Sequence, residues 1–163
     1  MLWLLEILLF ISLLAIAWQD FKSRMISLWL IIVFFLLNSA VFLFQNSLKD
    51  YFTNAAFCIA YMLVSYAFIR LYYLLGGRGK EQILDEKVGW GDVVIFLMMG
   101  FSLEPVELIF FYTFTFIFSL VLYLLFMSKK RPVPLAAFVS LIYLLKSVAE
   151  ILFPDYKISN YFF

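Results

Sequence analysis

The sequence predicts an all-α, polytopic membrane protein with about six transmembrane helices. Composition is the first reason, because 66% of the 163 residues are hydrophobic and only 14% are charged. A soluble domain is about half apolar and about a quarter charged. The second reason is that six apolar stretches are each about as long as a helix needs to cross the hydrocarbon layer. These stretches lack the apolar–polar alternation of outer-membrane barrel strands.

The apolar stretches follow one another with short polar connections and without an internal repeat, which favours one membrane-embedded domain over residues 1–163. The fourth stretch is short and ends at the turn from Ser102 to Pro105. The expected helices lie near residues 2–18, 26–44, 55–75, 92–103, 106–127 and 134–153.

Lysine and arginine in the connections predict how the chain is oriented. Short cytoplasmic loops of membrane proteins carry an excess of these two residues. Eight lie in the connections after the first, third and fifth stretches, whereas two lie on the other side. We therefore expect the three basic connections in the cytoplasm and both termini outside. The eight are Lys22, Arg24, Arg78, Lys80, Lys87, Lys129, Lys130 and Arg131, and the two are Lys49 and Lys157.

The residue inventory restricts the possible chemistry. The formal net charge is +1, so the chain lacks the strongly basic field that attracts nucleic acid. With one cysteine, Cys58, and no histidine, it lacks the usual ligands of zinc, haem and iron–sulfur clusters, and it cannot use a Ser–His or Cys–His pair. Hydrolysis would have to use carboxylates, lysine, or a metal held by oxygen. We expect neither a metal nor another cofactor.

Two aspartates are the candidate catalytic residues. Asp20 follows the first apolar stretch and Asp92 opens the fourth. Two complete spans separate them, and because this number is even, both carboxylates should lie at one membrane face, which the basic loops assign to the cytoplasm. In aspartyl peptide hydrolysis an ionised carboxylate accepts a proton from water while a protonated one donates to the carbonyl oxygen. Such a pair shares a proton because two like charges resist ionising together.

The residues before Asp92 are candidate substrate contacts. Gly89 and Gly91 flank Trp90, and glycine accepts backbone geometries closed to other residues and lets another segment come close. In a peptidase that segment would be an extended substrate. The alternative is that the glycines only end a loop and that Asp92 caps the following helix.

These segments resemble the prepilin and preflagellin peptidases, a family of membrane aspartyl proteases. Gly89–Trp90–Gly91–Asp92 is similar to their Gly-x-Gly-Asp signature, and Asp20 followed by a basic pair and Ile26 resembles their first catalytic segment. Residues 132–138 resemble the proline-containing start of their last helix. The resemblance implies an aspartyl endopeptidase of a bacterial or archaeal cytoplasmic membrane, with Asp20 and Asp92 as its catalytic pair.

The resemblance also implies a substrate, namely a membrane-inserted prepilin-like precursor whose short basic leader is removed at the junction with an apolar helix. Acidic residues in the connection after the third stretch are candidate contacts for the leader's positive charges, and the alternative is a solvated loop of mixed charge. These residues are Glu81, Asp85 and Glu86.

The chain departs from the family pattern at two positions near the aspartates. Val94 stands where these peptidases usually have a lysine, and Ser27 stands where a proline commonly follows the isoleucine. The methyltransferase region and the cysteine-containing zinc module of the larger bacterial members have no counterpart, so we do not expect N-methylation.

Two other kinds of function stay open. Asp20 and Asp92 could bind a cation or relay protons in a small transporter or channel, since acids at the membrane edge are functional candidates there too. Neither paired broken helices nor an inverted repeat favours this alternative. The third candidate is a non-catalytic scaffold subunit of a pilus or secretion assembly.

Lys146 and Glu150 are four residues apart in the last helix, which predicts an ion pair.

Overall fold

The computed structural model describes residues 2–23, 25–75, 89–126 and 134–152, without the side chains of residues 123–126 and 152. These ranges contain six helices and no strand, which confirms the predicted all-α fold. The helices are α1 (Leu2–Ser23), α2 (Leu28–Gln45), α3 (Leu48–Leu75), α4 (Trp90–Gly100), α5 (Pro105–Phe126) and α6 (Leu135–Leu152).

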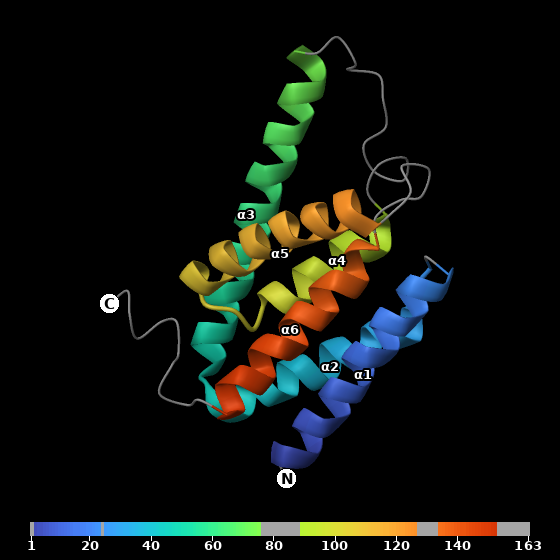
Figure 1. Ribbon diagram of the computed structural model, residues 1–163. Helices are drawn as coiled ribbons and strands as arrows, with labels where there is room; N and C mark the ends of the chain where they lie inside the picture. The colour runs from blue at the N-terminus through green and yellow to red at the C-terminus, as the bar shows by residue number, and fades with distance from the viewer. Residues whose placement is uncertain (1, 24, 76–88, 127–133, 153–163) are drawn as a thin grey trace.

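The helices differ in whether they are long enough to cross a membrane. By length and composition α1, α2, α3 and α5 are able to cross a membrane. The 28 residues of α3 correspond to about 42 Å, more than the roughly 30 Å of a hydrocarbon layer. In Figure 1, α3 extends well past the other helices at the end where α4 begins. By contrast, α4 has only 11 residues.

Two helix ends differ from the sequence prediction. The first helix does not stop near residue 18 but continues to Ser23, so Asp20 lies inside α1 rather than after it. The third begins at Leu48 instead of near residue 55, because Ser47 and Asp50 form a capping box. The Ser47 hydroxyl donates to Asp50 Oδ2 at 2.6 Å, and the Asp50 N–H donates to Ser47 Oγ at 3.2 Å. These hydrogen bonds start α3 in a polar stretch that hydropathy alone does not mark as helical.

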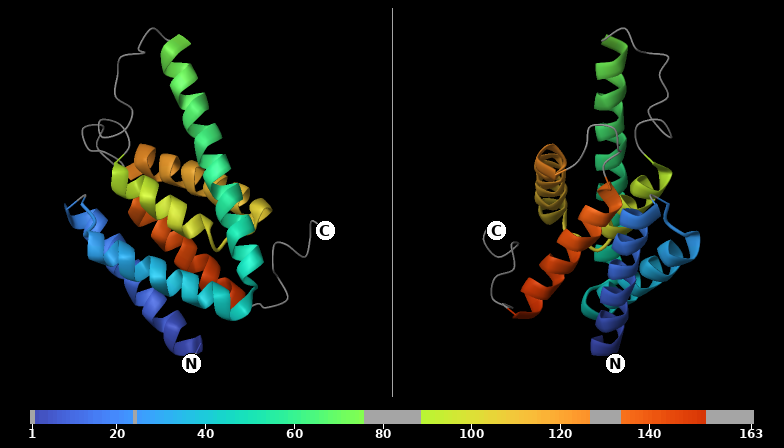
Figure 2. Two further views of the ribbon diagram at one scale, coloured as in Figure 1. Left: turned by 180° about the vertical axis from the view of Figure 1, so that it is seen from behind. Right: turned by 45° about the vertical axis from the view of Figure 1, so that its right-hand side comes forward.

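Three helices form the most extensively packed part of the structure. Helix α1 lies along both α2 and α6, and we call these three the α1–α2–α6 unit (Figure 2). Helix α4 has smaller contacts with α2, α3 and α6, and α5 contacts α3 and α6. The core between them is apolar and includes Leu13, Phe34, Ile95, Met99 and Val139. The two aspartates therefore belong to different parts of the fold, Asp20 to the unit and Asp92 to α4.

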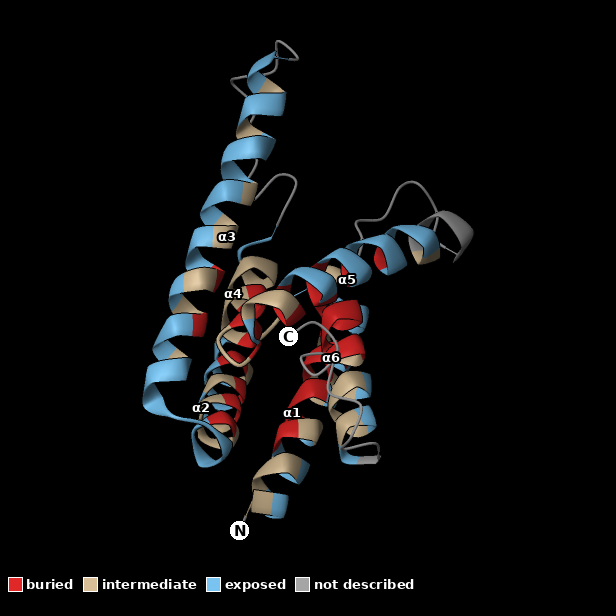
Figure 3. Cartoon of the chain, turned by 90° about the vertical axis from the view of Figure 1, so that its left-hand side faces the viewer, coloured by how far each residue is buried: buried red, intermediate tan, exposed pale blue. Residues whose placement is uncertain are grey.

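The outward-facing side chains are largely apolar. Phe68 and Tyr72 on α3 keep 69% and 76% of their surface exposed, and on α5 Phe114 keeps 58%. Figure 3 shows that α3 and α5 present long exposed faces. An apolar surface of this extent is unfavourable in water, whereas acyl chains cover it in a bilayer. The chain is therefore an integral membrane protein.

Candidate active site

Asp20 lies on the buried side of α1. Leu9, Leu13, Ile16 and Asp20 follow one another at helical spacings of four, three and four residues, so they share one face. All four are buried, and Asp20 keeps only 5% of its surface exposed. The helix thus places a carboxylate at the end of its apolar stripe, where the stripe packs against α6.

Asp92 is the third residue of α4. The residue at the N-cap position is Gly89, so the alternative in which Asp92 caps this helix is wrong. The Asp92 N–H donates to the Gly89 carbonyl at 3.1 Å, as expected for the first helical turn. The Asp92 side chain accepts a hydrogen bond from the first turn of α6.

Both carboxylates meet the first turn of α6. The Ala137 N–H donates to Asp20 Oδ2 at 2.8 Å, and the Ala136 N–H donates to Asp92 Oδ1 at 3.1 Å. These hydrogen bonds, with at most about 3.6 Å between neighbouring backbone nitrogens, limit the separation of the two oxygens to about 9.5 Å. The structure therefore brings Asp20 and Asp92 together at one helix end.

The start of α6 explains why its backbone N–H groups donate to side chains of other helices. The first turn of any helix has N–H groups without a helical acceptor, and a side chain at the N-cap usually bonds one of them. Pro134 precedes α6 and has no polar side chain, whereas its carbonyl accepts the Phe138 N–H at 3.2 Å. Asp20 and Asp92 thus cap α6 from two other helices. Ala136 and Ala137 are small and buried, so the carboxylates can approach the backbone closely.

This arrangement stabilises negative charge at the paired carboxylates. Each receives a backbone N–H, and the N-terminus of α6 presents the positive end of the helix dipole.

Contacts around the pair hold the helix ends in place. The Ser27 N–H donates to Gln19 Oε1 at 2.9 Å, which ties the α1–α2 connection to the last turn of α1. A proline at position 27 would lack this donor, so the departure from the family pattern has a structural use here. The rings of Phe21 and Phe138 meet edge to face at 5.6 Å between centroids and join the end of α1 to the start of α6.

The glycines before Asp92 have room for a Cβ atom at ordinary contact distances. Gly89 has φ −69° and ψ 140°, which any residue adopts, so the backbone at this position does not use the conformational freedom of glycine. A Cβ at Gly89 would lie 3.4 Å from Asp92 Oδ2, and one at Gly91 would lie 3.7 Å from Ile26 Cδ1. Trp90 is more than half exposed beside them. The other substrate-contact candidates, Glu81, Asp85 and Glu86, lie outside the described residues.

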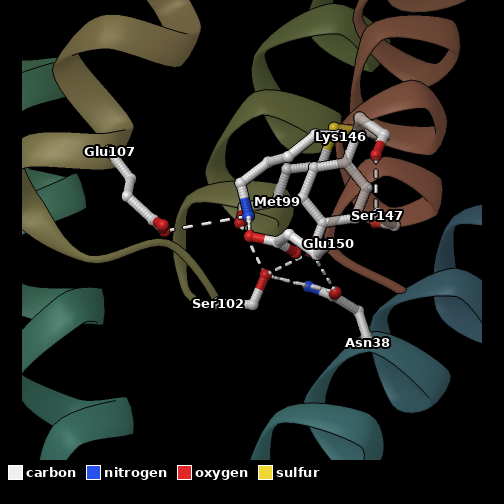
Figure 4. Close-up of polar contacts among 8 residues, drawn as sticks. Asn38, Met99, Ser102, Glu107, Lys146, Ser147 and Glu150 are labelled. Atoms are coloured by element: carbon white, nitrogen blue, oxygen red, sulfur yellow. Dashed lines mark hydrogen bonds and ion pairs between the residues drawn. The ribbon is translucent and has the colours of Figure 1, made fainter. Parts of the chain in front are cut away.

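A second polar cluster lies toward the opposite end of the helices. Lys146 and Glu150 form the predicted ion pair at 2.6 Å, and Lys146 Nζ also lies 3.8 Å from Glu107 Oε2 (Figure 4). This cluster lines a cavity of about 360 Å³ together with Asn38 and Tyr143. Sequence reasoning missed Glu107, although a lone acid within an apolar stretch was a visible signal.

The comparison with protein families identifies the chain. The model of the type IV leader peptidase family matches residues 7–125. The chain belongs to this family. Asp20 and Asp92 both lie within the match to the leader peptidase family, and α6, whose amides hold them, follows it along the chain. Curated proteins and solved structures each gave no match. Membership indicates a peptidase that acts on a membrane-associated protein.

Proposed function

We propose that this protein is an aspartyl endopeptidase that removes the short basic leader of membrane-inserted prepilin-like precursors, such as type IV pilins, pseudopilins or flagellin-like subunits. Family membership supports a leader peptidase in general. The observation that carries the finer assignment is the attachment of Asp20 and Asp92 to neighbouring amides of α6. Two carboxylates held in one small volume are the equipment that aspartyl hydrolysis needs.

The reaction uses the pair as one acid–base unit. The ionised carboxylate takes a proton from a water, whose oxygen attacks the scissile carbonyl, while the protonated carboxyl gives its proton to the carbonyl oxygen. The tetrahedral intermediate then collapses, its C–N bond breaks, and the leaving nitrogen receives a proton from the pair. The Ala136 and Ala137 amides hold the two carboxylates in register through these steps.

The position of the pair suits a substrate cut beside its apolar helix. Asp20 lies in the last turns of α1 and Asp92 in the first turn of α4, so both are near helix ends rather than mid-span. We place this end at the cytoplasmic face, because eight of the ten lysines and arginines outside the apolar stretches follow the first, third and fifth stretches. A basic leader in the cytoplasm then reaches the pair while the substrate's apolar helix stays in the bilayer.

Co-expression with a prepilin-type precursor tests the proposed function. Wild-type protein is expected to shorten the precursor by its leader, with the cut confirmed by mass spectrometry, whereas Asp92→Asn at the same protein level leaves it intact. Proton or cation flux into proteoliposomes without precursor processing would instead support a transporter. Absence of both processing and flux would support a scaffold subunit.

The hydrogen bond from Ala136 provides a second test. Ala136→Pro removes the N–H that Asp92 accepts, and proline is tolerated in the first turn of a helix. Loss of one hydrogen bond to a charged group corresponds to about 1.5 kcal/mol, so we expect a roughly tenfold lower kcat for leader cleavage. Leu135→Pro is the matched control, since it places proline in the same turn but removes neither of the two donors. Equal kcat values for the two variants would contradict a role for the Ala136 amide.

A further inference from the structure

Helix α4, which carries Asp92, is attached to the α1–α2–α6 unit by hydrogen bonds at two places. One is the bond between Asp92 and Ala136 in the candidate active site. The other lies at the far end of α4, where Asn38 of α2 donates to the Met98 carbonyl at 3.1 Å. Ser102, two residues after α4, is hydrogen-bonded to the unit at the same place.

The far attachment is a closed cycle of three side chains, of which Asn38 and Ser102 are labelled in Figure 4. Asn38 Nδ2 donates to Ser102 Oγ at 3.0 Å, Ser102 Oγ lies 2.7 Å from the Tyr143 hydroxyl, and the Tyr143 hydroxyl donates to Asn38 Oδ1 at 2.8 Å. When Ser102 donates to Tyr143, each donor in the cycle finds an acceptor. Asn38 and Tyr143 keep only 2% and 6% of their surfaces exposed, so the hydrogen bonds of the cycle are shielded from bulk solvent, which strengthens them.

Such a cycle fixes one position of α4. Apolar packing between helices in a bilayer is weakly selective, because lipid tails are as apolar as the side chains, whereas a buried hydrogen bond is satisfied in one register. The cycle joins α2, the end of α4 and α6, while Asp20 belongs to α1, which is packed along α2 and α6. Tyr143 is seven residues after Ala136, so the cycle lies roughly 10 Å along α6 from the aspartates.

We propose that Asn38, Ser102 and Tyr143 are positioning residues that set the placement of Asp92 relative to Asp20 by fixing α4 on the α1–α2–α6 unit. They do not touch the reacting atoms. The catalytic consequence rests on the proposed peptidase function, whereas the effect on the position of α4 does not depend on it. A displacement of a reacting group by about 1 Å lowers a rate strongly, so loss of the cycle reduces kcat without removing either carboxylate.

The test compares three single substitutions in full-length protein. Ser102→Ala removes one hydroxyl from the cycle, and Tyr143→Phe removes another while keeping the ring contacts with Phe34 and Phe111. Ser12→Ala is the matched control, because the Ser12 hydroxyl is also buried but bonds the Leu9 carbonyl within its own helix. For each variant, kcat and KM of leader cleavage are measured with a purified prepilin-type substrate.

A distance measurement makes the test independent of activity. Spin labels at Lys22→Cys on α1 and Trp90→Cys on α4, in a Cys58→Ala background, report the separation of the two helix ends by electron paramagnetic resonance. Ser102→Ala and Tyr143→Phe are expected to shift or broaden this distance by about 1 Å or more and to lower kcat about tenfold with little change in KM. Ser12→Ala leaves both quantities unchanged.

The outcomes separate the two proposals. If the label distance in Ser102→Ala and Tyr143→Phe equals that of Ser12→Ala, the positioning role is overturned, whatever happens to kcat. If the distance changes and kcat does not, the cycle fixes α4 but does not position a catalytic pair. If wild-type protein cleaves no precursor, the peptidase proposal fails, and the distances alone still decide whether the cycle holds α4.

Discussion

Asp20→Asn and Asp92→Asn are each expected to lower the kcat of leader cleavage by about 10⁴-fold, the upper range for loss of a general acid or base. An amide has the size of the carboxyl group and its oxygen still accepts the α6 N–H, so the capping of α6 by either side chain persists. It can neither take a proton from water nor deliver one to the substrate. The double variant is expected to be no slower than either single variant, because the two groups act in one step.

Single-turnover cleavage of a purified precursor measures these rates. Asp50→Asn is the matched control, since Asp50 is an exposed carboxylate that is hydrogen-bonded to Ser47 in the capping box of α3. We expect its kcat to equal that of wild type. A single variant at Asp20 or Asp92 that keeps more than about a hundredth of the wild-type kcat would show that this carboxylate does not transfer the essential proton.

Gly100→Ala is expected to destabilise the fold by about 3 kcal/mol, at the upper end of the range for overpacking a core. Gly100 ends α4 and lies against Cys58 of α3 and Tyr112 of α5. A Cβ there would be 2.2 Å from Cys58 Sγ and 2.7 Å from the Tyr112 hydroxyl, both closer than atoms can pack. Neither neighbour moves away easily, because both are fully buried and the Tyr112 hydroxyl donates to the Phe96 carbonyl.

Unfolding in mixed micelles, followed by helicity, gives the free energy difference. Gly91→Ala is the control in the same helix, because its added Cβ would meet Ile26 at an ordinary 3.7 Å, and we expect a change within about 0.5 kcal/mol. Cys58→Ala should relieve part of the Gly100→Ala cost, with a coupling energy of about 1 kcal/mol in the double-mutant cycle. Independent, additive effects would indicate that α4 and α3 adjust without contact at this point.

The number of helices and their approximate positions follow from local sequence, whereas the end of α1 and the start of α3 do not. Apolar runs locate the six helices because the bilayer selects for length and hydropathy. The run before Asp20 ends at Trp18, but α1 continues to Ser23, and the Asp20 carboxylate accepts a hydrogen bond from the distant Ala137 amide. The capping box at Ser47 and Asp50 was recognisable from spacing, and hydropathy hid it.

The candidate site was predictable in its residues but not in its geometry. An even number of spans between Asp20 and Asp92 predicts that both lie at one membrane face. The Gly-x-Gly-Asp segment marks the second acid. The amides that hold the pair belong to residues 117 and 44 positions away along the chain, and local sequence contains no signal for such contacts. The same holds for Asn38, which bonds Ser102 across 64 positions.

By itself, the sequence indicated that lipid surrounds the chain, that the chain is helical, and that Asp20 and Asp92 are the candidate acids. Hydropathy, helix length and the number of spans between two residues can all be read from consecutive residues. Only the tertiary structure decided that α6 supplies the donors to both carboxylates and that a buried cycle anchors α4. Pro134 leaves the first amides of α6 without a local cap, and which side chains reach them depends on how three helices pack.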